Sequence, residues 1–252
     1  MKKPIDIFMT RFNRAEITLK SIEYLIERTR YPYRLFLIDN GSDLELDHGY
    51  FLEEIKFKDN YGIHAAWNTA LALAESEYFI TADNDLYVPD LEPCWLTQMV
   101  KLMDNNKDYA AIAAQPHEYL GASTPTDCHS GVCKVSHCGA VVRLMRTDAV
   151  RKTGGWDHRL DAKRNHEEKT ICGKLRTNGW EVGYAEKIKC YHDFGDDDNW
   201  GYKEIHPHKH GHRIPGGGRF ATDTEKKGEI WPPPSHLSAK KDLYDPKTWE
   251  LK

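Results

Sequence analysis

Two aspartates, Asp83 and Asp85, directly follow residues 78–82, an apolar run typical of a buried strand. Carboxylates at this spacing and at a strand end can converge on one hard cation and leave room for phosphate oxygens and water. An EF-hand loop is excluded, because its turn glycine and its bidentate glutamate would fall on Val88 and Cys94. A solvated Asx turn is the simpler alternative. The segments around the pair must therefore decide between these interpretations.

Length and composition are those of a soluble protein with a substantial core. The chain has 252 residues, of which 40% are hydrophobic and 29% charged. Its formal net charge of −4 provides no overall attraction to nucleic acid or to an anionic membrane. No apolar run is long enough to span a membrane, and the one after Met1 is too short for a signal peptide. We therefore expect no integral membrane segment, a cytoplasmic location and reduced thiols.

The segments before residue 83 alternate between strand-like and helix-like patterns. Strands are expected over residues 5–9, 35–38, 55–57 and 78–82, and helices from residue 14 to before residue 31 and over 63–75. Asn13 and Glu16 have the spacing of a capping box for the first helix. The alternation predicts a parallel sheet covered by helices, in which ligands collect at the carboxyl ends of the strands. Arg11, Asp39 and the aspartate pair all stand at such ends.

The second half continues the alternation as far as residue 190. Helices are expected over residues 92–104, 148–152 and 166–178, strands over 110–114, 139–145 and 181–190, and a loop region over 116–136. From Asp196 onward the sequence is rich in turn residues and aromatic residues, which predicts an irregular C-terminal extension. The alternating histidines from His206 to His212 could hold a diphosphate if this extension closes as a lid. A solvated loop is the alternative.

Three cysteines recur at five-residue spacing: Cys128, Cys133 and Cys138. Because His129 and His137 lie close to them in the sequence, a zinc site is conceivable. None of the three, however, belongs to the C-x₂-C pair that structural zinc sites usually contain. Ordinary thiols are the favoured interpretation.

Taken in order, several short motifs resemble the family 2 glycosyltransferases of the GT-A fold. The resemblance covers about residues 4–192, and its motifs are Phe8-Met-Thr-Arg-Phe-Asn-Arg14, Ile38-Asp-Asn-Gly-Ser42, Asn60-Tyr-Gly62, Ala66-Trp-Asn68, Asp83-Asn-Asp85, Gly154-Gly-Trp-Asp157, Glu167-Glu168 and Asn178-Gly-Trp180. It implies an α/β, Rossmann-like and mostly parallel central sheet with helices on both faces. Residues 1–115 would form the nucleotide-sugar-binding half, 116–194 the acceptor-binding and catalytic half, and 195–252 the C-terminal extension.

The resemblance also implies a donor, a cofactor and residue roles. The donor would be a nucleoside-diphosphate sugar, most often of UDP, and the cofactor Mn2+ or Mg2+. By this resemblance, Thr10 and Arg11 would line the nucleotide, Asp39 would bind the base, and Asn60 would also contribute to donor binding. Asp83 would lie near the ribose and the diphosphate, and Asp85 would bind the metal.

Two positions leave alternatives open. The family usually carries arginine where this chain has Trp67, which could stack on a base or could belong to the core. This departure weakens the expectation of UDP. His192, just after the last expected strand, could be an additional metal or phosphate ligand, or its ring could be hydrogen-bonded to the backbone.

The helix expected over residues 166–178 carries the candidate catalytic carboxylate. Glu168 shares a helical face with Ile171, Cys172 and Leu175, which predicts that it points to the interior or a cleft. Glu167 lies about 100° round the helix and is expected to face solvent or an acceptor. The resemblance implies that Glu168 is the general base of an inverting transfer, although the family's pair is most often Glu-Asp. Alternatively, Asn165 as the N-cap residue and Glu168 three positions later could form a capping box.

The leading hypothesis is therefore an inverting, metal-dependent glycosyltransferase. Its acceptor could be a saccharide, a lipid carrier, a protein or a modified nucleic-acid base. One alternative is a nucleotidyltransferase of similar fold, which is disfavoured because no glycine-rich loop with a following lysine comes after the first strand. Another is a non-catalytic carbohydrate- or nucleic-acid-binding module with zinc at the Cys/His region.

Overall fold

The computed structural model describes residues 4–43, 45–46, 49–50, 53–116, 127–139, 142–157 and 167–192. The expected C-terminal extension and its histidine series lie outside these ranges. Among the described residues, no helix combines the length and the hydrophobicity needed to cross a membrane.

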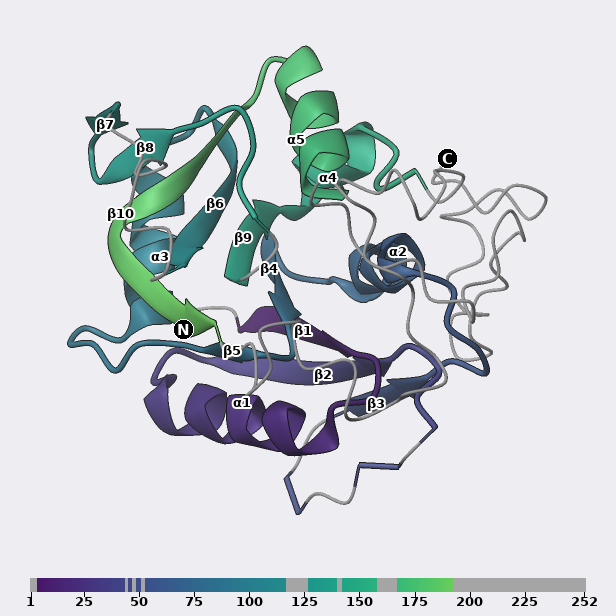
Figure 1. Ribbon diagram of the computed structural model, residues 1–252. Helices are drawn as coiled ribbons and strands as arrows, with labels where there is room; N and C mark the ends of the chain where they lie inside the picture. Colours follow the sequence, from purple (N-terminus) through teal and green to yellow (C-terminus); the bar gives the residue numbers. More distant parts are fainter. Residues whose placement is uncertain are drawn as a thin grey trace, which may run out of the picture.

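Strands and helices follow one another in the expected α/β order (Figure 1). The strands are β1 (Ile5–Arg11), β2 (Tyr33–Asp39), β3 (Glu53–Lys56), β4 (Tyr78–Asp83), β5 (Leu86–Tyr87), β6 (Tyr109–Pro116), β7 (Cys128–His129), β8 (Val132–Lys134), β9 (Val142–Arg146) and β10 (Glu181–His192). The helices are α1 (Ala15–Arg28), α2 (Ile63–Leu73), α3 (Trp95–Asn105), α4 (Thr147–Lys152) and α5 (Glu167–Thr177).

One mixed sheet joins both halves of the chain. Its strand order is β3-β2-β1-β4-β9-β6-β10-β8-β7, and β5 pairs with β10 outside this path. The pairs β3–β2, β2–β1, β1–β4 and β6–β10 are parallel, whereas β9 lies antiparallel between β4 and β6. Because the chain runs outward from β1 to β3 and then returns to β4, the strand order reverses beside β1. Ligands of open α/β sheets bind at such a reversal.

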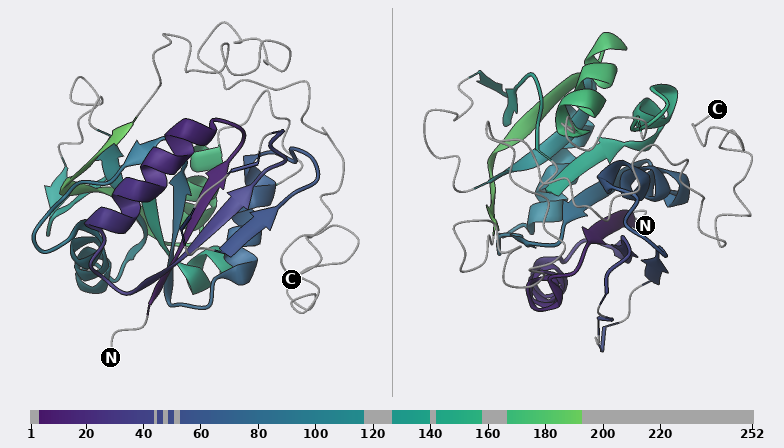
Figure 2. Two further views of the ribbon diagram at one scale, coloured as in Figure 1. Left: turned by 90° about the horizontal axis from the view of Figure 1, so that it is seen from below. Right: turned by 45° about the vertical axis from the view of Figure 1, so that its right-hand side comes forward.

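Helices cover both faces of this sheet. Ile7 and Met9 of β1 point to the face covered by α1 and α3, whereas Phe8 points to the face covered by α2, α4 and α5. This alternation follows from the two-residue period of a strand. Figure 1 and the left view of Figure 2 show α1 lying along one side of the sheet, with α2, α4 and α5 on the other side. The central strands therefore bury mostly apolar side chains on both faces, as expected for strands covered by helices on both sides.

The start of α1 differs from the expected capping box. The N-cap residue is Arg14, and no side chain caps the helix. Asn13 and Arg14 both have left-handed backbones, with φ of 58° and 52°. Two consecutive residues in this conformation turn the chain sharply out of β1. They carry the Asn13 side chain away from the helix end, and its oxygen accepts a hydrogen bond from the Asp43 backbone N–H at 2.9 Å instead.

The expected loop region over residues 116–136 contains a small hairpin, β7–β8. Ser130 and Gly131 form its two-residue turn, and both have positive φ, as a tight hairpin turn requires. Cys128 and Cys133 face each other across the two strands and form a disulfide. The expectation of reduced thiols is therefore wrong for this pair. Two sulfurs bonded to each other also cannot both act as thiolate ligands, so the disulfide argues against the zinc site that was considered as an alternative.

Asp6 lies at the start of β1, at the opposite end of the strand from the expected site. Its carboxylate is fully buried and accepts hydrogen bonds from Arg34 Nε at 2.7 Å and from the Glu75 backbone N–H at 2.8 Å. We expect Asp6→Ala to lower the free energy of unfolding by about 1–3 kcal/mol, because it leaves these donors without their acceptor. Urea unfolding followed by circular dichroism measures the change. An unchanged midpoint would contradict the structural role of Asp6.

Candidate functional site

The carboxyl ends of β1, β2 and β4 bring the predicted site residues together. Strand register pairs Arg11 of β1 with Asp39 of β2, and Thr10 of β1 with Asp83 of β4. These residues were predicted from separate strand ends, and the parallel pairing makes them neighbours. Thr10 is 6% exposed, and its side-chain oxygen has no hydrogen-bond partner in the structure. A buried hydroxyl in this state can serve a ligand.

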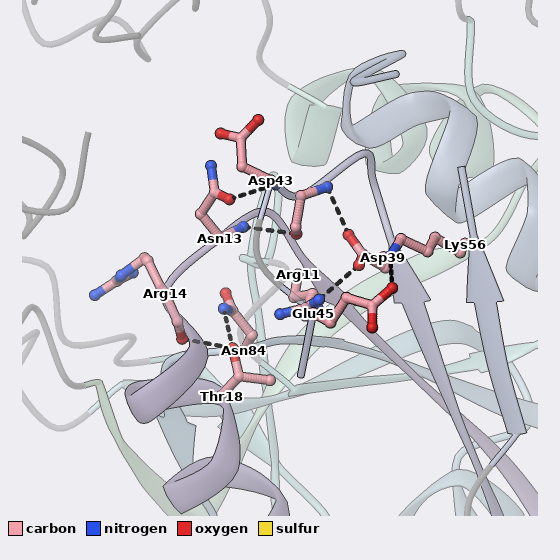
Figure 3. Close-up of polar contacts among 10 residues, drawn as sticks. Arg11, Asn13, Arg14, Thr18, Asp39, Asp43, Glu45, Lys56 and Asn84 are labelled. Atoms are coloured by element: carbon pink, nitrogen blue, oxygen red, sulfur yellow. Dashed lines mark hydrogen bonds and ion pairs between the residues drawn. The ribbon is translucent and has the colours of Figure 1, made fainter. Parts of the chain in front are cut away.

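A buried ion pair fixes the ends of β1 and β2. Arg11 Nη2 lies 2.6 Å from Asp39 Oδ2, and both side chains are 0% exposed. The other Asp39 oxygen accepts a hydrogen bond from the Ser42 backbone N–H at 2.8 Å (Figure 3). Both oxygens of Asp39 are therefore engaged within the protein. The base contact implied for Asp39 would require one of these partners to move, and it stays a prediction.

The loops after β1 and β2 are tied to each other. The backbone N–H of Asn13 donates to Ser42 Oγ at 2.8 Å, and the Asn13 side chain accepts from Asp43 (Figure 3). Gly41 has a φ of 78°, and a Cβ added there would lie 2.3 Å from the backbone carbon of Asp59. Only glycine therefore allows the loop after β2 to pack this closely against the backbone between β3 and α2.

The entry to α2 contains Asn60, which the sequence predicted as a site residue. Its side-chain oxygen accepts a hydrogen bond from the Gly62 backbone N–H at 2.9 Å, so it orders the turn before the helix. Asn40 supports the same turn by accepting from the Tyr61 N–H at 3.1 Å. Trp67, further along α2, is 0% exposed and packs in the core between the sheet and α2, α4 and α5. The alternative in which Trp67 stacks on a base is therefore corrected, because its ring is enclosed by the core.

The aspartate pair begins at the end of β4. Asp83 is partly exposed, whereas Asp85 is 8% exposed and its Oδ2 lies 2.5 Å from Arg14 Nη1. Between them, the Asn84 side chain donates to Thr18 Oγ1 at 2.7 Å (Figure 3). The turn is thus held by α1, and it is not the freely solvated Asx turn considered from the sequence. The contact between Arg14 and Asp85 could not be predicted from local sequence patterns, because the two residues are 71 positions apart.

The predicted metal positions, Asp83, Asp85 and His192, belong to the turn at the end of β4 and to the end of β10. Antiparallel pairing of β5 with β10 sets His192 opposite Leu86, the residue that follows Asp85. Backbone register thus places the His192 position beside the turn that carries Asp83 and Asp85. Two carboxylates and an imidazole are ligands that Mn2+ accepts, and the carboxylates suit Mg2+. Within the described part of the chain, no group of three or more His, Cys, Asp or Glu side chains lies close enough to hold a metal.

The two glutamates at the start of α5 are oriented differently from expectation. Glu167 was expected to face solvent or an acceptor, but it is 0% exposed. Its Oε2 accepts from Trp156 Nε1 at 2.9 Å and lies 3.2 Å from Arg143 Nη2. These partners come from the turn after α4 and from β9, and they draw Glu167 inward. Glu168 is partly exposed, and the expectation that it points to the interior or a cleft stays a prediction.

Two buried thiols lie in the same part of the core as Glu167. Cys138 and Cys172 are both 0% exposed, and their sulfur atoms are 3.9 Å apart. Hydrogen bonding from Cys138 lowers the pKa of the Cys172 thiol, whereas the same contact raises the pKa of Cys138. Cys138 is therefore part of the core and not of a surface zinc site, and the surrounding charges make this corner of the core polar.

Comparisons with known proteins give one family-model match and several structures of similar fold. Residues 6–124 match the family model of glycosyl transferase family 2. A mannosyltransferase from Pyrobaculum calidifontis, solved with GDP-Man and Mn2+, aligns with a TM-score of 0.63 at 14% identity and covers 77% of this chain. GalNAc-T7, solved with UDP, GalNAc and Mn2+, aligns with a TM-score of 0.61 at 13% identity over 75% of the chain. S. aureus TarS 1–349, solved with UDP-GlcNAc, gives 0.62 at 12% over 79%.

These alignments confirm the fold class expected from the sequence. The neighbours are glycosyltransferases of the GT-A fold, with the same mixed α/β arrangement. This chain spans only 58% of the mannosyltransferase, 43% of GalNAc-T7 and 61% of TarS 1–349. The division into halves at residues 115 and 116 stays a prediction.

The contact between Gly41 and the Asp59 backbone can be tested directly. We expect Gly41→Ala to destabilise the protein by about 1–3 kcal/mol, because the added Cβ overlaps backbone atoms and φ is positive. Gly173→Ala is the matched control, since Gly173 lies within α5 with open space around a Cβ, and alanine there favours the helix by about 0.5–1 kcal/mol. Thermal unfolding of both variants provides the measurement. Equal melting temperatures would contradict the close packing at Gly41.

Proposed function

We propose that this chain, whose residues 6–124 match the family model of glycosyl transferase family 2, transfers a sugar from a nucleoside-diphosphate sugar to an acceptor hydroxyl with inversion at the anomeric carbon. The observation that carries the proposal is the convergence of strand-end groups inside the matched segment. Arg11, Asp39, Asp83 and Asp85 come from three adjacent parallel strands and meet at one edge of the sheet. This edge is where an open α/β sheet binds its ligand.

On the donor side, the chain supplies a rigid floor for the diphosphate and the nucleoside. Thr10 presents a buried hydroxyl without a partner, which can donate to a phosphate or ribose oxygen. The ion pair of Arg11 and Asp39 joins the adjacent ends of β1 and β2. UDP is our leading donor, by family resemblance. GDP is the second, since the mannosyltransferase structure contains GDP-Man.

The residues that would hold the cation are Asp85 and Asp83, with His192 as a third ligand. A bound Mn2+ or Mg2+ neutralises the charge that develops on the departing diphosphate. Arg14 contacts one oxygen of the Asp85 carboxylate and so helps to orient the group. Both the mannosyltransferase and GalNAc-T7 structures contain Mn2+, which supports testing this ion first.

On the acceptor side, Glu168 is the proposed general base. It begins the first turn of α5 next to a fully buried neighbour, and it is partly exposed, so an acceptor hydroxyl can reach it. Removal of the hydroxyl proton by Glu168 accompanies attack on the anomeric carbon from the side opposite the diphosphate. One displacement of this kind inverts the configuration.

Loss of a ligand carboxylate tests the donor side. We expect Asp85→Asn to weaken nucleotide binding in the presence of Mn2+ by about 10–100-fold or more, the range seen when even a supporting metal contact is lost. Isothermal titration with UDP and GDP, with and without Mn2+, measures this. Asp90→Asn is the control, because Asp90 is an exposed aspartate paired with Arg30 on the surface. Unchanged affinity in Asp85→Asn would show that the metal assignment is wrong.

Glu168→Gln tests the base. The substitution keeps the size of the side chain and removes its charge, so we expect kcat for transfer to fall by about 10²–10⁴-fold. Nucleotide affinity should stay within about twofold, since Glu168 lies on a different element from the donor-binding strand ends. Glu186→Gln, at an exposed position of β10, is the control. Transfer close to the wild-type rate would assign Glu168 to helix capping alone.

A further inference from the structure

We propose that Glu167 is a positioning residue: its buried carboxylate fixes the first turn of α5 and thereby sets the place of Glu168, the neighbouring base. This proposal rests on the transferase function proposed above. The juxtaposition that carries it is a clamp, defined here as Arg143, Trp156 and Glu167, in which side chains from β9 and from the turn after α4 meet one carboxylate oxygen at the start of α5.

The clamp is buried and convergent. Arg143 and Glu167 are both 0% exposed, and Trp156 is 1% exposed. Glu167 Oε2 lies 2.9 Å from the indole Nε1 of Trp156 and 3.2 Å from Arg143 Nη2. A single oxygen thus accepts both a neutral and a charged hydrogen bond. Such a pair of donors, fixed in direction, leaves the carboxylate little freedom to move.

Arg143 is held by the centre of the sheet. In the β9 ladder it stands opposite Thr81 of β4 and opposite Ala113 of β6. Its second terminal nitrogen lies 3.4 Å from the carbonyl oxygen of Cys138. The guanidinium therefore extends from a strand that is hydrogen-bonded to a neighbour on each side.

Trp156 is held by the donor-side helix. The Asn68 side chain on α2 donates to the Trp156 carbonyl oxygen at 2.8 Å and accepts from the Trp156 N–H at 2.9 Å. This two-point contact fixes the backbone of Trp156, and its indole then fixes Glu167. The clamp consequently links α2, within the family-matched segment, to α5. Lys174 of α5 adds a further tie, because its Nζ donates to the carbonyl oxygen of Gly155 at 2.8 Å.

Stability alone does not account for this arrangement. Burying two charges costs several kcal/mol for each ion, and an apolar pair of similar volume is often equally stable or more so. What an ion pair with an added indole donor provides, and an apolar pair does not, is a defined direction. Glu168 is adjacent to Glu167 in the first turn of a helix, so a shift of one moves the other. A misplacement on the order of 1 Å can cost about 10²-fold in rate.

A double-mutant cycle tests the proposal. We expect Glu167→Gln to lower kcat for transfer by about 10–100-fold, with nucleotide affinity in Mn2+ within about twofold of wild type. If Glu167 acts only through its neighbour, Glu167→Gln should cause no further loss of kcat in a Glu168→Gln background. Multiplied losses in the double variant, or an unchanged kcat in Glu167→Gln, would overturn the positioning role.

A second variant guards against misfolding of Glu167→Gln. Trp156→Phe keeps the ion pair and most of the ring volume but removes the indole donor, and the same cycle with Glu168→Gln applies to it. A readout independent of activity is hydrogen exchange of the Trp156 indole N–H by NMR. We expect slow exchange in the wild type and in Glu168→Gln, and faster exchange in Glu167→Gln. Fast exchange in the wild type would refute the clamp.

The outcomes also separate the two proposals. A wild-type protein that turns over no nucleotide sugar with Mn2+ would overturn the transferase function, and the positioning role would fall with it. A wild-type protein that transfers sugar but shows multiplied losses in the cycle would overturn the positioning role alone.

Discussion

The buried pair of Arg11 and Asp39 is the constraint on which the site depends. Two unit charges at 0% exposure are costly to place in a protein interior, and removing either partner typically destabilises a protein by about 3–5 kcal/mol. The pair therefore determines how the ends of β1 and β2 sit. The loop from Asp39 to Ser42 starts from this carboxylate, and Asn13 is tied to that loop. The turn that brings Arg14 to Asp85 begins after Arg11, at the end of β1. The segments of the proposed donor side therefore all start next to this ion pair.

The proposed acceptor side contains a second buried ion pair, between Arg143 and Glu167. Both side chains are buried as completely as those of Arg11 and Asp39. Their contact joins β9 of the sheet to the first turn of α5, which carries Glu168. Neither pair is a strong argument for stability, since the gain in attraction is offset by desolvation. Each is a strong argument for geometry, because the carboxylate accepts further hydrogen bonds from defined directions. The molecule thus uses one buried arginine–carboxylate pair on each side of the proposed reaction.

Much of the fold could be predicted from the sequence, since its longer strands and helices have clear periodicity. What periodicity does not contain is strand direction, so the antiparallel insertion of β9 between β4 and β6 could not be inferred. The strands β5 and β7 are only two residues long, too short for any pattern. At Asn13 a local rule failed, because the capping interaction with Glu16 competed with a backbone donor 30 residues away and lost. Long-range partners decided each of these cases.

The same reasoning explains which parts of the site could be foreseen. Strand-end residues were predictable as a group, because parallel strands in one sheet must end at one edge. Side-chain direction in the first turn of α5 was not, because apolar spacing describes the body of a helix and not its entry. Glu167 turns inward to meet Arg143 and Trp156, which come from 24 and 11 residues away. Trp67 likewise belongs to the core although its motif suggested a ligand. The motif of each residue therefore indicated the helix or strand that carries it. Its long-range contacts decided which way its side chain faces.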